Sequence, residues 1–155
     1  MRIYQFLDQA QVPFEILQHA PAFSAQKLAK YLHLPGRVIA KSVLLKTLSR
    51  FFIAILQADE RLDKEKLKHE FSEKVGLANP MEIQDHFPDC EWGVVPGLGA
   101  PYGLEVVMEE SLLATPHLIL AGHSHLEAIK LRLEDLIRVE TPKQLSLIAG
   151  IRTPV

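Results

Sequence analysis

The sequence predicts a mixed α/β fold in which a central, barrel-like mixed β-sheet is flanked by helices. Two neighbouring segments, 38–47 (VIAKSVLLKT) and 50–58 (RFFIAILQA), are apolar on both faces, which is typical of strands inside a sheet that is covered on two sides. Other segments show the apolar spacing of amphipathic helices. Because helices and strands do not alternate strictly, the sequence favours this arrangement over a doubly wound fold.

In the first half of the chain, apolar side chains at helical spacing predict a helix over 1–10, which Pro13 ends. A short apolar run at 14–17 (FEIL) predicts a strand. Ser24 then suits the N-cap of an amphipathic helix over 25–34, and the two central strands follow.

In the second half, two amphipathic helices are expected at 62–72 and 79–87, the latter capped by Asn79 with Pro80 at its first position. Residues 91–103 (EWGVVPGLGAPYG) are rich in glycine and proline and predict a structured loop. Three strands and a closing helix complete the chain, at 104–109, 117–122, 126–133 and 133–139.

Length and composition indicate the class of protein. The 155 residues suggest a single domain over 1–155, and 48% hydrophobic with 23% charged residues is typical of soluble globular proteins. No apolar stretch approaches the ~20 residues that span a bilayer, and the first residues do not resemble a secretory signal. The lone Cys90 excludes an internal disulfide framework. We therefore expect a cytoplasmic protein with no membrane partner.

Charge is distributed unevenly. The net charge of −2 argues weakly against nucleic-acid binding, but residues 20–58 contain no Asp or Glu. The same segment contains six cations, namely Lys27, Lys30, Arg37, Lys41, Lys46 and Arg50. This predicts one electropositive face, the alternative being that acidic partners come from elsewhere in the fold.

Lys41 lies inside an apolar strand, where an ammonium buried alone would be costly. It shares strand parity with Val43 and Leu45. In a pocket it would meet a phosphate or a carboxylate as a point charge. The alternatives are that it reaches the rim of the sheet or forms an ion pair with Glu105 or Glu109.

His123 and His125 are two residues apart, so in an extended chain both would point to the same side. Such a pair is half of a zinc site, but Cys90 and the remaining histidines show no recognisable ligand spacing, so metal is the least favoured interpretation. The other two are backbone capping and a polar site in which one imidazole binds substrate or water.

The glycine-proline loop contains Gly93, Gly97, Gly99 and Gly103 and matches neither a dinucleotide fingerprint nor a P-loop. Glycines at this density let a ligand approach backbone groups, which would hold an amino group or an oxyanion. The alternative is a tight double turn. No serine or cysteine has the context of a nucleophile, so a hydrolase built on this chain would use water.

Three stretches, taken in this order, resemble the YbaK/prolyl-tRNA-synthetase-associated domain family. They are QHAPAFSAQKLAKYLHLPGRVIAKSVLLK, WGVVPGLGAPYGLEVVMEESL and LILAGHSHLEAIKLRLEDLIRV, and the match runs from about His19 to Val139. The resemblance implies a mixed α/β fold with a barrel-like sheet and a metal-independent, cofactor-free hydrolase. Its substrate would be mischarged aminoacyl-tRNA, acted on in trans by a free-standing protein. Association with a synthetase and the oligomeric state are left open.

Site residues follow from the same resemblance. Lys41 matches the lysine that positions the terminal nucleotide, Gly93 opens the loop around the aminoacyl group, and His125 matches the histidine before the last strand. Further expected substrate-binding residues are His19, Phe23, Ser24, Gly97, Gly99 and His123, of which His123 has no assigned family equivalent. The expected tRNA-binding residues are Lys27, Lys30, Arg37 and Lys46.

Two positions depart from the family pattern, which usually has a second proline where this chain has Gly97 and an aromatic where it has Leu98. These departures bear on pocket size and amino-acid selectivity, and they favour the rival interpretation. In that interpretation the chain is a non-catalytic module that binds a nucleotide, the tRNA 3′ end or a synthetase. A third, weaker interpretation is a metal-dependent hydrolase using His123 and His125.

Overall fold

The structure is a computed structural model that describes residues 2–148. Its helices are α1 (Arg2–Gln9), α2 (Ala25–Leu32), α3 (Lys64–Phe71), α4 (Pro80–His86) and α5 (Leu133–Glu140). Its strands are β1 (Glu15–Gln18), β2 (Ala40–Lys46), β3 (Phe51–Gln57), β4 (Gly76–Leu77), β5 (Glu105–Glu109), β6 (His117–Ala121), β7 (Glu127–Arg132) and β8 (Lys143–Leu145). Short 3₁₀ turns lie at η1 (Gly36–Val38), η2 (Ala100–Tyr102) and η3 (Glu110–Ala114). The predicted mixed α/β class is confirmed.

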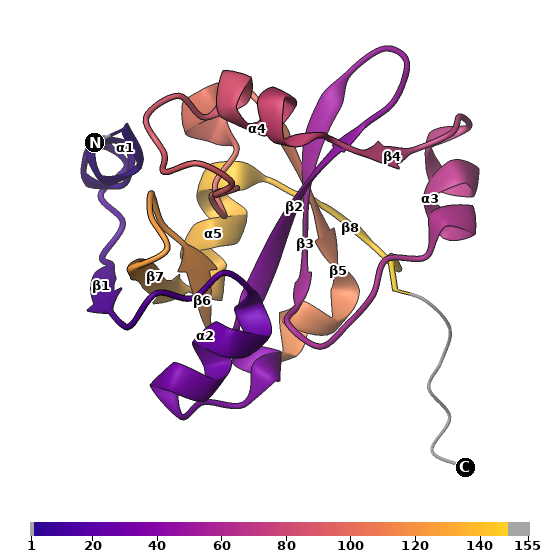
Figure 1. The fold of residues 1–155 in the computed structure, drawn as a ribbon. Helices are drawn as coiled ribbons and strands as arrows, with labels where there is room; N and C mark the ends of the chain where they lie inside the picture. The colour runs from indigo at the N-terminus through magenta and orange to yellow at the C-terminus, as the bar shows by residue number, and fades with distance from the viewer. Residues whose placement is uncertain (1, 149–155) are drawn as a thin grey trace.

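The strands form two sheets, not the one central sheet that was expected (Figure 1). One is antiparallel with the order β1-β7-β6, and the other is mixed with the order β4-β2-β3-β5-β8. Within residues 2–148, the two sheets are joined by one parallel bridge, from Ile39, just before β2, to Ile119 of β6. A closed barrel needs continuous pairing around its wall, so the described strands approach a barrel without closing one.

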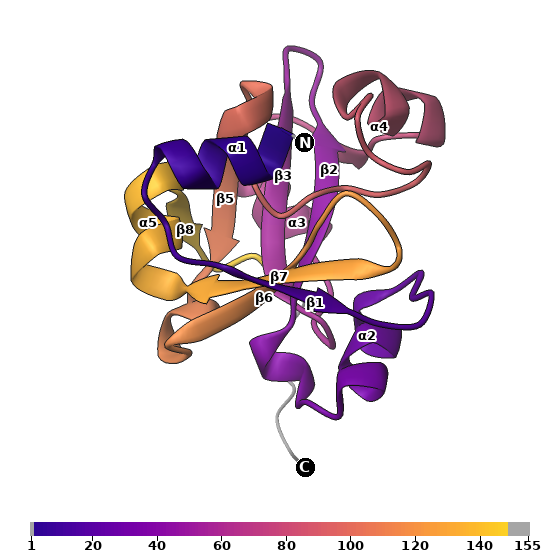
Figure 2. The ribbon, with the colours of Figure 1, turned by 90° about the vertical axis from the view of Figure 1, so that its left-hand side faces the viewer.

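The five-stranded sheet is covered on both faces, as the two apolar runs predicted. Alternate residues such as Leu44 and Ile53 face α1, α5 and the second sheet, where the largest core cluster lies. Their neighbours Leu45 and Phe52 face the opposite way and pack with Leu67 of α3. Figure 2 shows α1 crossing above the β1-β7-β6 sheet, with α2 below its far end.

Capping residues fix the starts of the helices. The Ser24 hydroxyl accepts the N–H of Lys27 at 3.1 Å, as expected of an N-cap. Asn79 and Glu82 form a capping box at the start of α4, with Pro80 in the first turn. His33 adopts a left-handed conformation with φ 53°, so α2 ends at Leu32 and not at residue 34.

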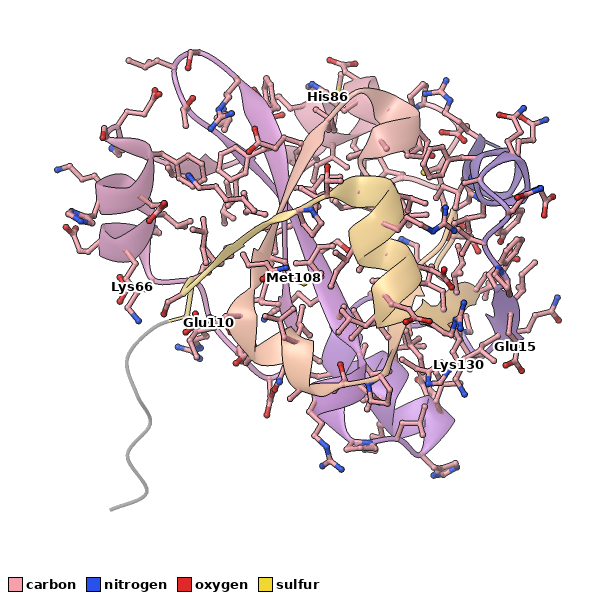
Figure 3. All side chains as sticks on the ribbon, turned by 180° about the vertical axis from the view of Figure 1, so that it is seen from behind. Glu15, Lys66, His86, Met108, Glu110 and Lys130 are labelled. Atoms are coloured by element: carbon pink, nitrogen blue, oxygen red, sulfur yellow. The ribbon has the colours of Figure 1, made fainter. Side chains whose placement is uncertain are left out.

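The sequence missed β4 and β8, which are two and three residues long. Such short edge strands show no detectable alternation, and their pairing to β2 and β5 is set by neighbours distant in sequence. Figure 3 shows the molecule from behind, with Lys66 of α3 and Lys130 of β7 on opposite sides and the buried Met108 of β5 between them. No helix within residues 2–148 is long and apolar enough to cross a membrane.

Candidate active site

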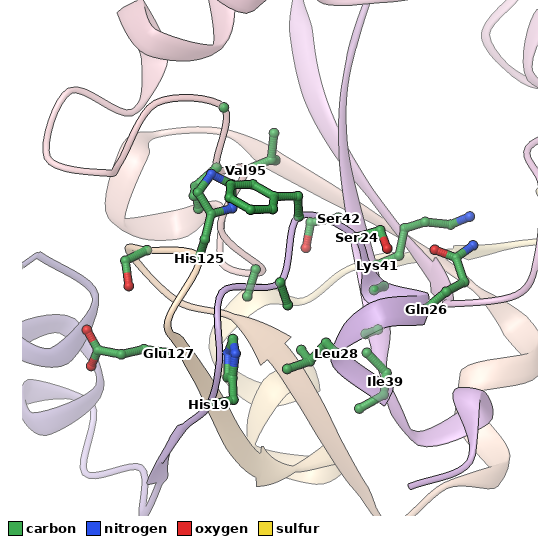
Figure 4. A pocket seen from close by; sticks show the side chains of 18 of the residues that line it. His19, Ser24, Gln26, Leu28, Ile39, Lys41, Ser42, Val95, His125 and Glu127 are labelled. Atoms are coloured by element: carbon green, nitrogen blue, oxygen red, sulfur yellow. The ribbon is translucent and has the colours of Figure 1, made fainter. Parts of the chain in front are cut away.

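A cavity of about 310 Å³ opens between α2, the start of β2 and two loops (Figure 4). Four separate stretches line it, from residues 19–28, 39–43, 93–95 and 121–127. Lys41, Gly93 and His125 therefore share one cavity although they lie far apart in the chain. His19, Phe23 and Ser24 line it as well.

His125 is held in place by contacts of both its backbone and its imidazole ring. Its backbone N–H donates to Glu91 Oε1 at 2.8 Å, and its Nε2 lies 3.0 Å from the carbonyl oxygen of Trp92. Because a carbonyl only accepts, Nε2 carries the hydrogen in this tautomer, and Nδ1 keeps its lone pair. The ring also packs against Phe23, with ring centroids 4.4 Å apart. His125 therefore offers a positioned proton acceptor.

Gly93 lies in the left-handed region at φ +84°, where any residue with a side chain would be strained. A Cβ built on it would lie 4.0 Å from His125 Nε2, so the backbone passes close to the imidazole. Bonds from the Val94 N–H to Glu91 and from the Gly97 N–H to Ala121 hold the loop. Among residues 2–148, the N–H groups of Gly93 and Val95 meet no hydrogen-bond acceptor.

Lys41 lies at the rim of the cavity. It occupies the face of β2 that turns towards α3, and its Nζ donates to the carbonyl oxygen of Glu60. Figure 4 shows the ammonium end directed away from His125. Burial lowers the pKa of Lys41, and the neighbouring charges of Asp59 and Glu60 act in the opposite direction.

The proposed ion pairs of Lys41 with Glu105 or Glu109 are wrong. Glu105 pairs with Arg50 at 2.6 Å, and Glu109 accepts the backbone N–H groups of Ser111 and Leu147. The Lys41 ammonium instead donates a hydrogen bond to a main-chain carbonyl. Sequence alone does not reveal such a partner. The hydrogen-bond acceptor of Lys41 is a neutral carbonyl, while the negative charges of Asp59 and Glu60 also act on the ammonium.

The cavity wall nearest α2 is formed by His19, Phe23 and Ser24. His19 Nδ1 lies 2.7 Å from the carbonyl oxygen of Ala20, so it carries the hydrogen and Nε2 is an acceptor. Phe23 is 76% exposed and stands at the mouth of the cavity. The Ser24 hydroxyl accepts the Lys27 N–H as the cap of α2, and its own O–H can still donate.

The cavity contains polar groups that lack partners. Three buried side-chain atoms have no hydrogen bond in the described part of the chain: Ser42 Oγ, His19 Nε2 and His123 Nδ1. The first two belong to residues that line this cavity. The sequence did not assign Ser42 to the site, and the available signal was a hydroxyl within an apolar strand.

Gly97 and Gly99 do not line the cavity, and both serve packing. A Cβ on Gly97 would lie 2.6 Å from the Leu120 Cβ, and one on Gly99 would lie 2.5 Å from the Leu104 carbonyl oxygen. Leu98 is 1% exposed in the main core. The two positions that depart from the family pattern, 97 and 98, therefore lie outside the cavity lining.

His123 also lies outside the cavity, and the expectation that both imidazoles point to one side is wrong. Residues 123–126 form bends and turns, not an extended strand. His123 is buried, with its Nε2 3.2 Å from Asp89 Oδ2 and its ring edge-on to Tyr4. Burial is the main cause that lowers the pKa of His123.

His123, Asp89 and Cys90 have potential metal-ligating atoms within 4.8 Å of one another. Hydrogen bonds already occupy this group, because Tyr102 donates to Asp89 at 3.2 Å and lies 3.6 Å from the Cys90 sulfur. Burial raises the pKa of the Cys90 thiol to about 11, so it is a poor nucleophile at neutral pH. None of the three lines the cavity.

The four expected tRNA-binding cations divide into two groups. Lys27, Lys30 and Arg37 are exposed on α2 and the following 3₁₀ turn, and they take part in none of the ion pairs found within residues 2–148. Lys46 pairs with Glu82 at 2.8 Å. Because α2 also lines the cavity, the first group lies on an element that borders the candidate site.

Comparison with known families places these features in context. A family model described as an aminoacyl-tRNA editing domain matches residues 19–139. The chain matches no curated protein sequence significantly.

Solved structures share the fold at low identity. One, named as a candidate trans-editing enzyme for prolyl-tRNA synthetase, has a TM-score of 0.84, 19% identity and 96% coverage of both chains. A second, a hypothetical protein, has a TM-score of 0.86, 15% identity and coverage of 96% of this chain and 100% of its own. A third is described as a signal transduction protein from Marinobacter aquaeolei, with a TM-score of 0.73 and 14% identity. The match covers 96% of this chain and 30% of that one.

Proposed function

Because the chain belongs to the aminoacyl-tRNA editing domain family, we propose that it is a trans-acting hydrolase that deacylates mischarged tRNA. One observation carries the proposal: Lys41, Gly93 and His125, from three distant stretches, line the same cavity. Residues 1–155 would act as one cytoplasmic domain, with mischarged aminoacyl-tRNA as substrate. The likeness to a structure named as a candidate trans-editing enzyme supports this assignment.

Water is the attacking group in the proposed reaction. Nδ1 of His125 has a free lone pair because Nε2–H is held by the Trp92 carbonyl. The imidazole accepts a proton from water, directly or through the ribose hydroxyl next to the ester, as the water oxygen attacks the ester carbonyl. The tetrahedral intermediate then expels the ribose oxygen, which takes up the proton. No serine, cysteine or metal takes part in this scheme.

The oxyanion would be stabilised by the loop backbone. The N–H groups of Gly93 and Val95 have no acceptor among residues 2–148, and both residues line the cavity. Those of Val94, Gly97 and Gly99 are already bonded within the protein. Among the loop residues that line the cavity, Gly93 and Val95 are therefore the two whose N–H groups can meet a developing negative charge.

Lys41 would hold the terminal phosphate outside the cavity. Its ammonium lies at the rim, where an anion can stay partly hydrated while the ester enters between Gly93 and His125. A phosphate is a better partner for the ammonium than the neutral Glu60 carbonyl, because in that bond both the donor and the acceptor are charged. Fixing the phosphate fixes the distance to the ester and so orients it for attack.

The first experiment is a deacylation panel with tRNAs that carry alanine, serine, cysteine, threonine or proline. We expect hydrolysis of at least one mischarged tRNA. Lys41→Ala should lower kcat/KM by about 10- to 100-fold, the value of one charge-assisted bond. His125→Ala should lower it by about 100-fold or more through loss of the base. Lys68→Ala, an exposed cation on α3, is the matched control and should retain wild-type rates.

Two outcomes would contradict the proposal. Binding to every aminoacyl-tRNA without turnover would favour the non-catalytic module. Unchanged rates in Lys41→Ala across the whole panel would remove Lys41 from the mechanism, even if the hydrolase activity itself is present.

A further inference from the structure

A second cavity, of about 260 Å³, lies on the face of β2 that turns towards α3. Figure 1 shows α3 and β4 on one side of β2, with β6 and β7 on the other. Gly93 and His125 do not line the second cavity, which is therefore distinct from the candidate active site. Its apolar wall draws on β2, β3, α3 and β4, through Leu45, Leu56, Leu67 and Leu77.

Lys41 connects the two cavities, because it lines both of them. Its ammonium is directed away from His125 (Figure 4) and donates to the carbonyl oxygen of Glu60. The next residue along the chain, Arg61, lines the second cavity. An anion bound by Lys41 would therefore have the candidate active site on one side and the second cavity on the other.

Two more cations, Arg61 and Lys64, line the second cavity, and no acidic residue among residues 2–148 does so. Both side chains are exposed, and neither takes part in an ion pair found in the described part of the chain. Lys64 is also the first residue of α3, where the helix dipole adds to its positive charge. The lining thus favours an anionic ligand.

The carboxylates nearby are directed to other partners. Asp59 and Glu60 act on the Lys41 ammonium with their charges, but neither lines the second cavity. Oε1 of Glu60 accepts the backbone N–H of Gln57, and Oδ1 of Asp63 caps the start of α3. The groups that face the cavity are therefore cationic or apolar. This suits a ligand that joins an anion to a flat group with apolar faces, and the phosphate and base of a nucleotide have that chemistry.

We propose that the second cavity binds the nucleotide that precedes the terminal adenosine of tRNA, which is a cytidine in every tRNA. The inference rests on the proposed function, in which Lys41 holds the phosphate that joins these two nucleotides. When the aminoacyl adenosine lies on the first side of that phosphate, the cytidine lies on the other. Its base then packs against Leu77, and its own 5′ phosphate meets Arg61 and Lys64.

The test compares three uncharged ligands, whose affinities are measured by NMR titration of the whole protein. Adenosine 5′-(methyl phosphate) carries the phosphodiester alone, the dinucleotide CpA adds the cytidine, and pCpA adds the second phosphate. We expect CpA to bind at least about tenfold tighter than the methyl ester, because its cytosine leaves water for an apolar wall. We expect pCpA to bind about two- to fivefold tighter than CpA at low salt.

Leu77→Ala removes the apolar side chain nearest solvent, and since Leu77 is 62% exposed the fold tolerates its loss. This variant should weaken CpA binding by about three- to tenfold and leave the methyl ester unaffected. Leu48→Ala, in the exposed β2–β3 turn and outside the cavity, is the matched control and should bind both ligands as the wild type does.

Replacing Arg61 and Lys64 together with alanine should remove the advantage of pCpA over CpA. The same double replacement at Lys68 and Lys74, which are exposed and do not line the cavity, should keep it. An advantage that survives the loss of both Arg61 and Lys64 would overturn their assignment to the second phosphate.

Binding separates this inference from the proposed function. Leu77-dependent binding of CpA, with no hydrolysis of any aminoacyl-tRNA, would refute the hydrolase and keep the second cavity as a nucleotide site. Equal affinities for CpA and the methyl ester would overturn the inference, whether or not the protein hydrolyses aminoacyl-tRNA. Chemical-shift changes on CpA binding that are confined to the first cavity would also overturn it.

Discussion

Glu140, the last residue of α5, is a buried carboxyl that holds the glycine-proline loop. Its Oε1 accepts the backbone N–H of Gly99 at 2.8 Å and that of Ala100 at 3.0 Å. Burial raises its pKa to about 7, although the two N–H bonds act to lower it. One side chain therefore links the far end of the loop to the C-terminal helix, while Gly93 at the near end lines the cavity.

The raised pKa of Glu140 predicts a pH-dependent stability. The unfolded carboxyl titrates near 4.5 and the folded one near 7, so between these values the folded state binds more protons. Stability contributed by this group is then complete below about pH 4.5 and falls as pH rises through 7, by on the order of 3 kcal/mol. Chemical denaturation from pH 4.5 to 8 should show this decline in the wild type.

Glu140→Gln is the control for that decline, because its amide does not titrate. The difference in unfolding free energy between the wild type and this variant should change across the same pH range. A constant difference would show that Glu140 is not responsible.

The segment between α4 and β5 makes different contacts in its first and second parts. Its first part brings Gly93 and Val95 to the cavity, and its second part packs against β6 and α5 through Gly97 and Gly99. Local composition predicted a structured loop with either a ligand role or a tight turn. The packing contacts of Gly97 and Gly99 fit the tight turn, and a ligand role for the part that lines the cavity stays a prediction.

Gly97→Ala should destabilise the fold, because the new methyl group would meet the Leu120 side chain at 2.6 Å. Overpacking of this kind costs about 1–3 kcal/mol. Gly76→Ala is the matched control, since a Cβ there meets nothing within 4 Å and its φ is not in the left-handed region. Thermal unfolding should show a lower Tm for Gly97→Ala alone, and equal values for both variants would contradict the packing role.

At the scale of the whole molecule, part of the positive charge that the sequence concentrates in residues 20–58 lies on the helix that borders the cavity. Lys27 and Lys30 are exposed on α2, the helix that also contributes Ala25 and Leu28 to the cavity. A tRNA whose 3′ end enters the cavity would therefore bring its acceptor backbone past these cations. Lys46 is less available because Glu82 neutralises it.

The salt dependence of tRNA binding tests whether the lysines of α2 contact the tRNA backbone. Each phosphate contact adds about 0.7–0.9 to the slope of log K against log salt concentration. Replacing Lys27 and Lys30 together with alanine should reduce the slope for an acceptor-stem minihelix by about 1–2. The same double replacement at Lys68 and Lys74, which are exposed on and just after α3, should leave the slope unchanged. An unaltered slope in the variant that lacks Lys27 and Lys30 would mean that the tRNA backbone does not contact these two lysines.

The sequence by itself determined the fold class, nearly every helix and long strand, and the residues to examine. Apolar periodicity, the caps at Ser24 and Asn79 and the Gly-Pro loop are local features, and local features are visible in a single chain. Tertiary structure decided the rest: two sheets in place of one, different surroundings for His123 and His125, and a Glu60 carbonyl as the partner of Lys41. These depend on groups brought together from distant parts of the chain, which no local pattern encodes. The unpaired hydroxyl of Ser42 belongs to the same class, since a missing partner is visible only when every neighbour is known.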